Sequence, residues 1–133
     1  MHDGQQRIPI TNDFDVACAV MISRQLAKDL GFRETAQCKI STTVSELGHN
    51  IIKYAGCGWI VLLPLTTRGQ TGLEIRAEDN GPGIDDVACA LQDNYSTGGT
   101  LGLGLPGVRR LMDEFVVQSE PQTGTKVTAR KWL

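Results

Sequence analysis

The sequence predicts one domain of the α/β (α+β) class, because helical patterns and strand hairpins share a chain of 133 residues. The hydrophobic content of 41% and the charged content of 21% are typical of a globular protein. The formal net charge of −2 gives no strong attraction to nucleic acid or to an anionic membrane. We therefore expect a single domain over residues 1–133, with neither nucleic acid nor membrane as a partner.

The expected location is the cytoplasm. The first residues contain no basic segment followed by an apolar core, so no signal peptide is expected. No apolar run approaches the ~20 residues that a membrane helix needs. Cys18, Cys38, Cys57 and Cys89 are widely spaced and form no metal-binding pair. Widely spaced thiols without a disulfide framework fit a reducing compartment.

The first half of the chain predicts an edge strand and two helices. The strand covers residues 7–11, and Pro9 favours an edge position because it cannot donate to a neighbour. The first helix is expected over residues 13–30 with Asn12 as its N-cap. The second helix is expected over residues 35–54, and glycines end both helices.

The second half predicts two strand hairpins with a long irregular segment between them. The first hairpin joins strands at 59–65 and 73–79 through a turn at 66–72, and the second joins EFVVQSE to TKVTARKW through the turn PQTG. A glycine-rich segment over about 80–104 and a short helix at about 105–113 separate them. A segment this long inside a compact domain is usually functional or disordered, so we expect a lid there.

An acidic residue continues the apolar face of the strand at 73–79. Leu73, Ile75 and Ala77 share one face, and Asp79 is in phase with them. An inward carboxylate is costly unless it is hydrogen-bonded. Asp79 is therefore either a ligand-binding group or the start of an Asx turn at Gly81 that ends the strand, and this segment alone leaves both open.

Polar residues form a stripe on the second helix. Glu46 and Asn50 are four residues apart and share one face, which Thr43 and Lys53 extend. This stripe lies roughly 110° around the helix from the apolar one, at the edge of the core. The alternative is a solvated face with a chance Glu/Asn pair.

Glycines before the short helix predict a phosphate-binding segment. Gly102, Gly104 and Gly107 match the pattern G-x-G-x-x-G, and Pro106 suits the first helical turn. Backbone N–H groups at such a helix start can bind an anion. A dinucleotide site is the minor alternative. Such a site requires a strand directly before the glycines and a full crossover helix after them, whereas a loop and a short helix are expected here. Glu120 at a strand end is the feature that keeps this alternative open.

Three motifs occur in order along the chain. They are Glu46-Leu-Gly-His-Asn50, Asp79-Asn-Gly81-Pro-Gly83 and Gly102-Leu-Gly104-Leu-Pro-Gly107. These motifs resemble the N, G1 and G2 boxes of the GHKL ATPases, the family of gyrase, Hsp90 and histidine kinases. The whole chain closely resembles the RsbT-type serine/threonine switch kinases, which are relatives of the anti-sigma-factor kinases.

The resemblance implies a fold and a set of roles. The fold is a two-layer sandwich of the Bergerat type, with a mixed, mainly antiparallel sheet and helices on one face. Asp79 is implied to accept the adenine amino group beside Thr125, Asn50 to hold Mg²⁺, and Glu46 and Lys53 to act in catalysis on ATP. The implied nucleotide-binding residues are Asn50, Asp79, Gly81, Gly83, Ser96, Thr97, Gly98, Gly99, Gly102, Leu103, Gly104 and Thr125.

The implied function is ATP-dependent phosphorylation of serine or threonine on a STAS-domain antagonist protein. The setting is a partner switch of a bacterial stress-signalling, stressosome-like complex, with a PP2C-type phosphatase as a further partner. The alternative is a nucleotide-dependent sequestering module of the anti-sigma type, which transfers no phosphate and does not require Glu46. One departure from related kinases is that residues 81–104 contain no Lys or Arg, so Lys53 is the candidate to supply the charge for the γ-phosphate. Arg109 and Arg110 are alternatives, but they better fit a surface or partner-binding pair.

Overall fold

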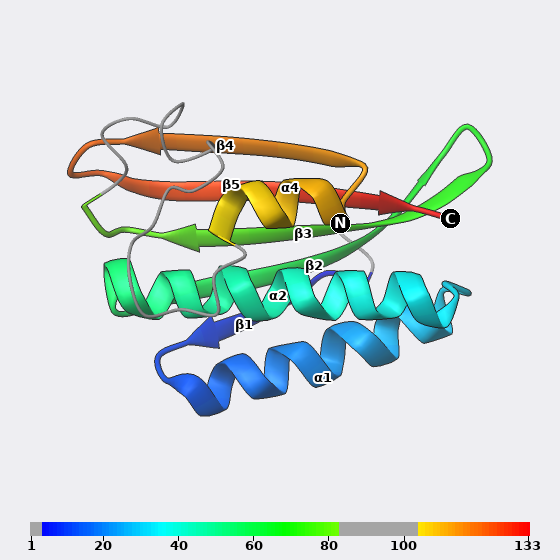
Figure 1. The fold of residues 1–133 in the computed structure, drawn as a ribbon, viewed down its shortest axis with the longest axis horizontal. Coiled ribbons are helices and arrows are strands. Elements are labelled where there is room, and N and C mark those ends of the chain that lie inside the picture. Colours follow the sequence, from blue (N-terminus) through cyan, green and yellow to red (C-terminus); the bar gives the residue numbers. More distant parts are fainter. Residues whose placement is uncertain (1–3, 83–103) are drawn as a thin grey trace.

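An antiparallel sheet with helices packed on one face forms the protein (Figure 1). The computed structural model describes residues 4–82 and 104–133. The elements in chain order are β1 (Gln6–Ile10), α1 (Asp13–Asp29), α2 (Glu34–Ala55), β2 (Gly58–Thr67), β3 (Gln70–Asp79), α4 (Gly104–Leu111), β4 (Glu114–Glu120) and β5 (Gly124–Trp132). The predicted site residues outside the described ranges are Gly83, Ser96, Thr97, Gly98, Gly99, Gly102 and Leu103.

The strands follow the order β1-β2-β3-β5-β4. Each pair of neighbouring strands in the described residues is antiparallel, so the predicted sheet is antiparallel rather than mixed in this part of the chain. The predicted edge position of β1 is confirmed, because β1 pairs only with β2 in this order and Pro9 lies opposite Trp59. β5 enters the sheet between β3 and β4, and therefore lies beside the strand that carries Asp79.

The hairpin between β2 and β3 is tighter than predicted. The turn consists of Arg68 and Gly69, whose φ angles are 50° and 78°. Two successive residues with positive φ are typical of the type I′ turn, whose twist matches that of the paired strands. The predicted turn at 66–72 was therefore too long, because Thr66 and Thr71 pair across the hairpin and extend both strands.

The helix ends agree with their sequence signals. The side-chain oxygen of Asn12 accepts a hydrogen bond from the Asp15 N–H at 2.9 Å, which confirms the predicted N-cap of α1. In turn, Asp15 accepts from the hydroxyl of Thr11 at 2.6 Å and from its N–H at 2.8 Å, and these bonds hold the pKa of Asp15 below its usual range. At the other end, α2 stops at Gly56, which has a φ of 84°.

The core lies between the helices and the sheet. The predicted apolar stripe of α2 is confirmed, because Ile40, Val44, Leu47 and Ile51 are at most 2% exposed. α2 packs against β1, β2, β3 and β5, while α1 packs against α2 and β1. The two helices approach closely at Gly48, where a Cβ atom would lie 3.0 Å from Val16 Cγ1. A side chain at position 48 would therefore require Val16 to shift.

The opposite face of the sheet carries charged side chains. Glu74, Arg76 and Glu78 alternate with the inward residues of β3, as the sequence predicts. Glu74 is only 5% exposed, and Arg130 Nε donates to its carboxylate at 2.9 Å. Arg76 Nη1 lies 3.6 Å from the same carboxylate, so Glu74 has two cationic neighbours. Arg130 is 40% exposed and also lies 3.4 Å from Glu114.

Candidate active site

Asp79 ends β3 on the face that packs against the helices. Leu73 and Ile75 are fully buried on the same face, and Asp79 follows in phase as a partly buried side chain. Its Oδ1 atom accepts a hydrogen bond from the Gly81 N–H at 2.9 Å. The Asx-turn interpretation is therefore confirmed, and the side chain points inward as the alternation predicts, whereas its role as a ligand-binding group stays a prediction. A carboxylate has two acceptor oxygens, so the Asx turn still leaves Asp79 the capacity to accept from a ligand.

Thr125 and Ser119 lie in line with Asp79 across the sheet. Asp79 on β3 is the register partner of Thr125 on β5, which is the register partner of Ser119 on β4. Residues directly opposite one another in antiparallel strands share a face, so the three side chains form one polar row. The predicted position of Thr125 beside Asp79 is present, and its role toward adenine stays a prediction.

Ser119 is the member of this row that the sequence analysis missed. Its Oγ lies 3.0 Å from Thr125 Oγ1 and donates to the Gly124 carbonyl oxygen at 3.1 Å. A signal was available, because Phe115 and Val117 alternate with it and indicate the inward face of the strand. The strand partner of Ser119 could not be read from this alternation.

Glycines hold the segment after Asp79 close to its neighbours. A Cβ atom on Gly81 would lie 2.6 Å from Ala55 Cβ, so the turn after β3 packs directly on the end of α2. On the other side, Gly124 has a φ of +135°, and a Cβ there would collide with the carbonyl oxygen of Asp79. The Gln122 N–H also donates to the Pro82 carbonyl oxygen. The absence of a side chain at Gly81 therefore has a packing reason, in addition to the predicted approach of a nucleotide base.

Substitution of Gly124 by alanine should destabilise the protein by about 2–4 kcal/mol, through backbone strain and overpacking against Asp79. Gly69→Ala is a matched control, because Gly69 has a φ of +78° but no atom lies within 4 Å of its would-be Cβ. That control should cost only the strain, about 1–2 kcal/mol. Urea unfolding of both variants measures the difference. Equal losses would show that the contact of Gly124 with Asp79 is unimportant.

The polar stripe of α2 leads toward the same end of the molecule. Glu46 and Asn50 are partly buried, as predicted for residues at the edge of the core, whereas Lys53 is exposed. The Lys53 ammonium lies 5.3 Å from the centroid of the Tyr54 ring, on the exposed side of the last turn. Since Ala55 at the end of α2 contacts Gly81, the structure brings the C-terminal half of α2 to the end of β3.

The short helix α4 begins and ends earlier than predicted. It covers Gly104–Leu111 rather than 105–113, and Gly104 starts it with a φ of 57°. Pro106 is buried in the first turn, as expected for a residue whose missing N–H has no helical partner there. At the other end, the Lys131 ammonium donates to the Leu111 carbonyl oxygen at 3.2 Å. The helix packs against α2, so its N-terminal N–H groups belong to the same layer as Glu46 and Asn50.

Oxygen ligands suitable for Mg²⁺ are present on α2. Mg²⁺ usually retains several waters and takes one or two protein oxygens together with substrate phosphates. The carboxamide of Asn50, one turn from the carboxylate of Glu46, fits that requirement. Within residues 4–82 and 104–133, no group of three or more His, Cys, Asp and Glu side chains could hold a metal by itself. The donor set therefore fits a metal that arrives with a phosphate ligand rather than a structural metal site.

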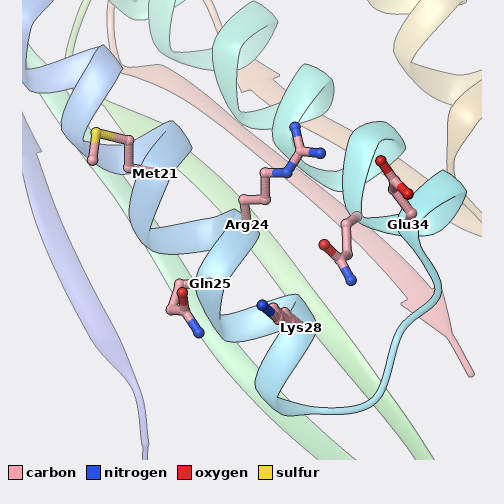
Figure 2. A pocket seen from close by; sticks show the side chains of 6 residues that line it. Met21, Arg24, Gln25, Lys28 and Glu34 are labelled. Carbon is pink, nitrogen blue, oxygen red and sulfur yellow. The ribbon is translucent and has the colours of Figure 1, made fainter.

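A surface hollow lies away from these residues. It has a volume of about 530 Å³ and is formed between the second half of α1 and the start of α2 (Figure 2). Its lining residues are Met21, Arg24, Gln25, Lys28, Glu34 and Gln37. Glu34 and Ala55 are the two ends of α2, roughly 30 Å apart along the helix. The hollow is therefore separate from the end of β3 where Asp79 lies.

A comparison with protein families decides the classification. Residues 36–133 match the family described as histidine kinase-, DNA gyrase B-, and HSP90-like ATPase. The chain belongs to this ATPase family. The match covers α2 except for its first two residues, the complete β2–β3 and β4–β5 hairpins and α4, which are the elements that carry the residues described above.

Individual relatives place this ATPase more narrowly. It is 46% identical over 131 residues to the serine/threonine-protein kinase RsbT of Bacillus subtilis (strain 168), with 98% of each chain covered. It is 37% identical over 100 residues to the anti-sigma F factor of Halalkalibacterium halodurans, covering 71% of this chain and 68% of the relative. The nearly full-length similarity to RsbT places this ATPase among the serine/threonine-protein kinases of the family.

Solved structures agree on the fold of this ATPase. The mycobacterial sensor histidine kinase MprB superposes with a TM-score of 0.56 at 13% identity, covering 96% of this chain and 97% of that chain. The histidine kinase domain of the blue-light activated kinase from Erythrobacter litoralis EL346 gives 0.52 at 20% identity, covering 90% of this chain and 59% of that one. The predicted Bergerat-type layering is thus confirmed. No helix in residues 4–82 and 104–133 combines the length and hydropathy required to cross a bilayer.

Proposed function

We propose that this kinase transfers the γ-phosphoryl group of ATP to a serine or threonine of a STAS-domain antagonist protein. The reaction belongs to a partner switch of a bacterial stress-signalling, stressosome-like complex in the cytoplasm, where a PP2C-type phosphatase is a further partner. One observation carries the proposal: the inward carboxylate of Asp79 lies opposite Thr125 and is held by Gly81 against the end of the helix that presents Glu46 and Asn50.

Asp79 and Thr125 are the proposed base-binding pair. The side chains point from neighbouring strands to the helix side of the sheet, where the end of α2 closes the space. A carboxylate that accepts from an exocyclic amino group selects adenine, because guanine presents a carbonyl oxygen at that position. The phosphates then extend toward α2, Gly104 and the N-terminus of α4, where backbone N–H groups favour an anion. We further propose that residues 1–133 act as one domain with a glycine-rich lid at about 80–104.

Glu46 and Asn50 are proposed to serve the transfer step. Asn50 would hold Mg²⁺, which supplies charge neutralisation and orientation of the phosphates. Glu46 accepts the proton of the partner's hydroxyl group, and the oxygen of that hydroxyl group forms a bond to the γ-phosphorus. The bond from that phosphorus to the bridging oxygen breaks, and ADP leaves. The partial burial of Glu46 suits this role, because water competes less for a half-buried carboxylate.

A binding module without phosphotransfer remains the second candidate. The similarity to an anti-sigma F factor favours it, because that relative is named as a factor that acts on another protein. Such a module needs Asp79, Thr125 and Asn50 to bind its nucleotide but has no need of a base at Glu46. The chemistry of Glu46 therefore separates the two candidates.

Mass spectrometry of the partner tests the proposal. A STAS-domain protein is incubated with this kinase, ATP and Mg²⁺, and its mass is compared with that of a sample lacking ATP. We expect the gain of one phosphate on the partner. A stable complex that forms in ATP without any mass change would support the binding module instead.

The exposed Lys53 should affect transfer more than binding. Substitution by alanine should slow phosphorylation while it leaves the Kd for ADP nearly unchanged, because ADP lacks the γ-phosphate whose charge Lys53 is proposed to offset. Arg109→Ala is the matched control, since Arg109 is also an exposed cation and should mainly lower affinity for the partner. Single-turnover transfer and calorimetry measure the two effects. Normal transfer by Lys53→Ala would show that another cation completes the site.

A further inference from the structure

A lysine occupies an inward position at the far end of the sheet face that carries Asp79. Thr125, Val127 and Ala129 alternate on the helix side of β5, and Lys131 follows in phase with them. Its side chain is only 14% exposed, and the proposed transfer reaction gives it no part. Like Asp79 at the end of β3, Lys131 is a charged residue that continues an apolar alternation, and such a charge requires polar partners.

The polar partners of Lys131 lie where α4 ends. The Lys131 ammonium donates to the Leu111 carbonyl oxygen at 3.2 Å, and it lies 3.5 Å from Asp113 Oδ1. The other carboxylate oxygen of Asp113 accepts from the Trp132 N–H at 2.7 Å. The Asp113 N–H donates in turn to the Arg130 carbonyl oxygen at 2.9 Å. These contacts join the last turn of α4, and the residues directly after it, to the end of β5.

The contacts of Lys131 restrain α4 in a way that its apolar packing does not. Val108 of α4 is fully buried in the core, and the helix packs against α2 (Figure 1). Apolar packing holds α4 in this layer but has no preferred direction, whereas a hydrogen bond does. The bond from Lys131 to the last carbonyl group of α4 therefore limits how far the helix can slide or turn over the sheet. A cation at this end also interacts favourably with the helix dipole.

The opposite end of α4 is the part proposed to meet the phosphates. The helix runs from Gly104 to Leu111, roughly 10 Å along its axis, so a shift at one end displaces the other. Lys131 lies six residues along β5 from Thr125, roughly 20 Å, and so does not touch a base bound beside Thr125 and Asp79. We propose that Lys131 is a positioning residue that holds the N–H groups at the start of α4 in place for the phosphates of the nucleotide. This inference rests on the phosphate site of the proposed function.

Loss of Lys131 should weaken the phosphate contribution to binding and leave the base contribution unchanged. Lys131→Met keeps a long unbranched side chain but removes its charge and its donors. We expect this variant to lower ADP affinity by about two- to tenfold, the value of one hydrogen bond, while the Kd for adenosine stays near the wild-type value. Lys131→Arg retains a charged donor and should restore ADP affinity. Lys126→Met is the matched control for charge, because Lys126 is an exposed cation on the other face of the same strand, and it should leave the ratio of the two affinities unchanged.

Calorimetry with ADP and an NMR titration with adenosine measure the two affinities on the full chain. A ratio of ADP affinity to adenosine affinity that is the same in Lys131→Met and in wild type would overturn the inference. Equal losses of affinity for both ligands would also overturn it, since that pattern indicates a general structural role. Should Lys131→Met not fold, Lys131→Gln, whose side chain is uncharged and shorter, is held to the same criteria.

The same measurements distinguish this inference from the proposed function. If wild-type protein binds ADP no more tightly than adenosine, the phosphate site itself is wrong. If wild-type protein binds ADP more tightly than adenosine and Lys131→Met preserves that difference, only the role of Lys131 is wrong.

Discussion

Replacement of Glu46 by glutamine is expected to lower partner phosphorylation by about 10²–10⁴-fold, the usual range for loss of a general base. The affinity for ATP should change little. Glutamine has nearly the same shape and can still form hydrogen bonds at this partly buried position of α2, but it cannot take up the proton of the attacking hydroxyl. Single-turnover transfer at saturating ATP and Mg²⁺ measures the rate, and calorimetry measures the binding.

Glu34→Gln is the matched control for this experiment. Glu34 is an exposed carboxylate on the same helix, in its first turn and roughly 30 Å from the end that contacts Gly81. The control should transfer phosphate at the wild-type rate. A normal rate in Glu46→Gln would show that the base lies elsewhere, and a loss of ATP affinity equal to the loss of rate would assign Glu46 to binding. If the wild-type protein binds the partner but transfers no phosphate to it, the result would favour the sequestering module.

Replacement of Asp79 by asparagine is expected to weaken nucleotide binding by about 1.5–3 kcal/mol, the range for a hydrogen bond to a charged group. This corresponds to about ten- to over a hundredfold in Kd. Asparagine can still accept from the Gly81 N–H, a bond of 2.9 Å in the wild type, so the Asx turn should persist. Its other terminal group becomes an NH₂ donor, which repels the amino group of adenine. The variant therefore tests ligand binding separately from the turn.

Two further variants make the Asp79 experiment specific. Glu78→Gln neutralises the adjacent carboxylate, which faces the other side of the sheet beside Arg76, and should leave the Kd for ATP near the wild-type value. Asp79→Ala removes both the ligand contact and the Asx turn, so it should lower the Tm as well as the affinity. Equal ATP affinity in wild type and Asp79→Asn would refute the adenine site.

Short-range features of the fold could be predicted from the sequence. The N-cap at Asn12, the end of α2 at Gly56 and the edge strand with Pro9 were all correct. Each depends on residues that are neighbours in the chain: a side chain that satisfies an exposed helix N–H, a glycine that accepts positive φ, or a proline without a donor. The amphipathic stripe of α2 was predictable for the same reason, since its spacing is set by helix geometry.

Several long-range contacts could not be predicted from local sequence patterns. The two-residue turn at Arg68 and Gly69 depends on the pairing of Thr66 with Thr71, which holds only when the whole register of the hairpin is known. The close packing of Gly124 against Asp79 joins residues 45 positions apart, and nothing near either residue indicates the other. The position of Gly81 against Ala55 likewise depends on the packing of α2 across the sheet.

The sequence by itself determined that Asp79 points inward, because side chains of a strand alternate with a period of two and Leu73, Ile75 and Ala77 mark the buried face. It likewise determined that Glu46 and Asn50 share one face of a helix. Local patterns did not determine what Asp79 meets there: the family resemblance implied Thr125, and only the tertiary structure added Ser119. The strand order β3-β5-β4 sets Thr125 and Ser119 beside it, and strand order is a non-local choice governed by burial of the whole sheet rather than by any residue's own neighbours.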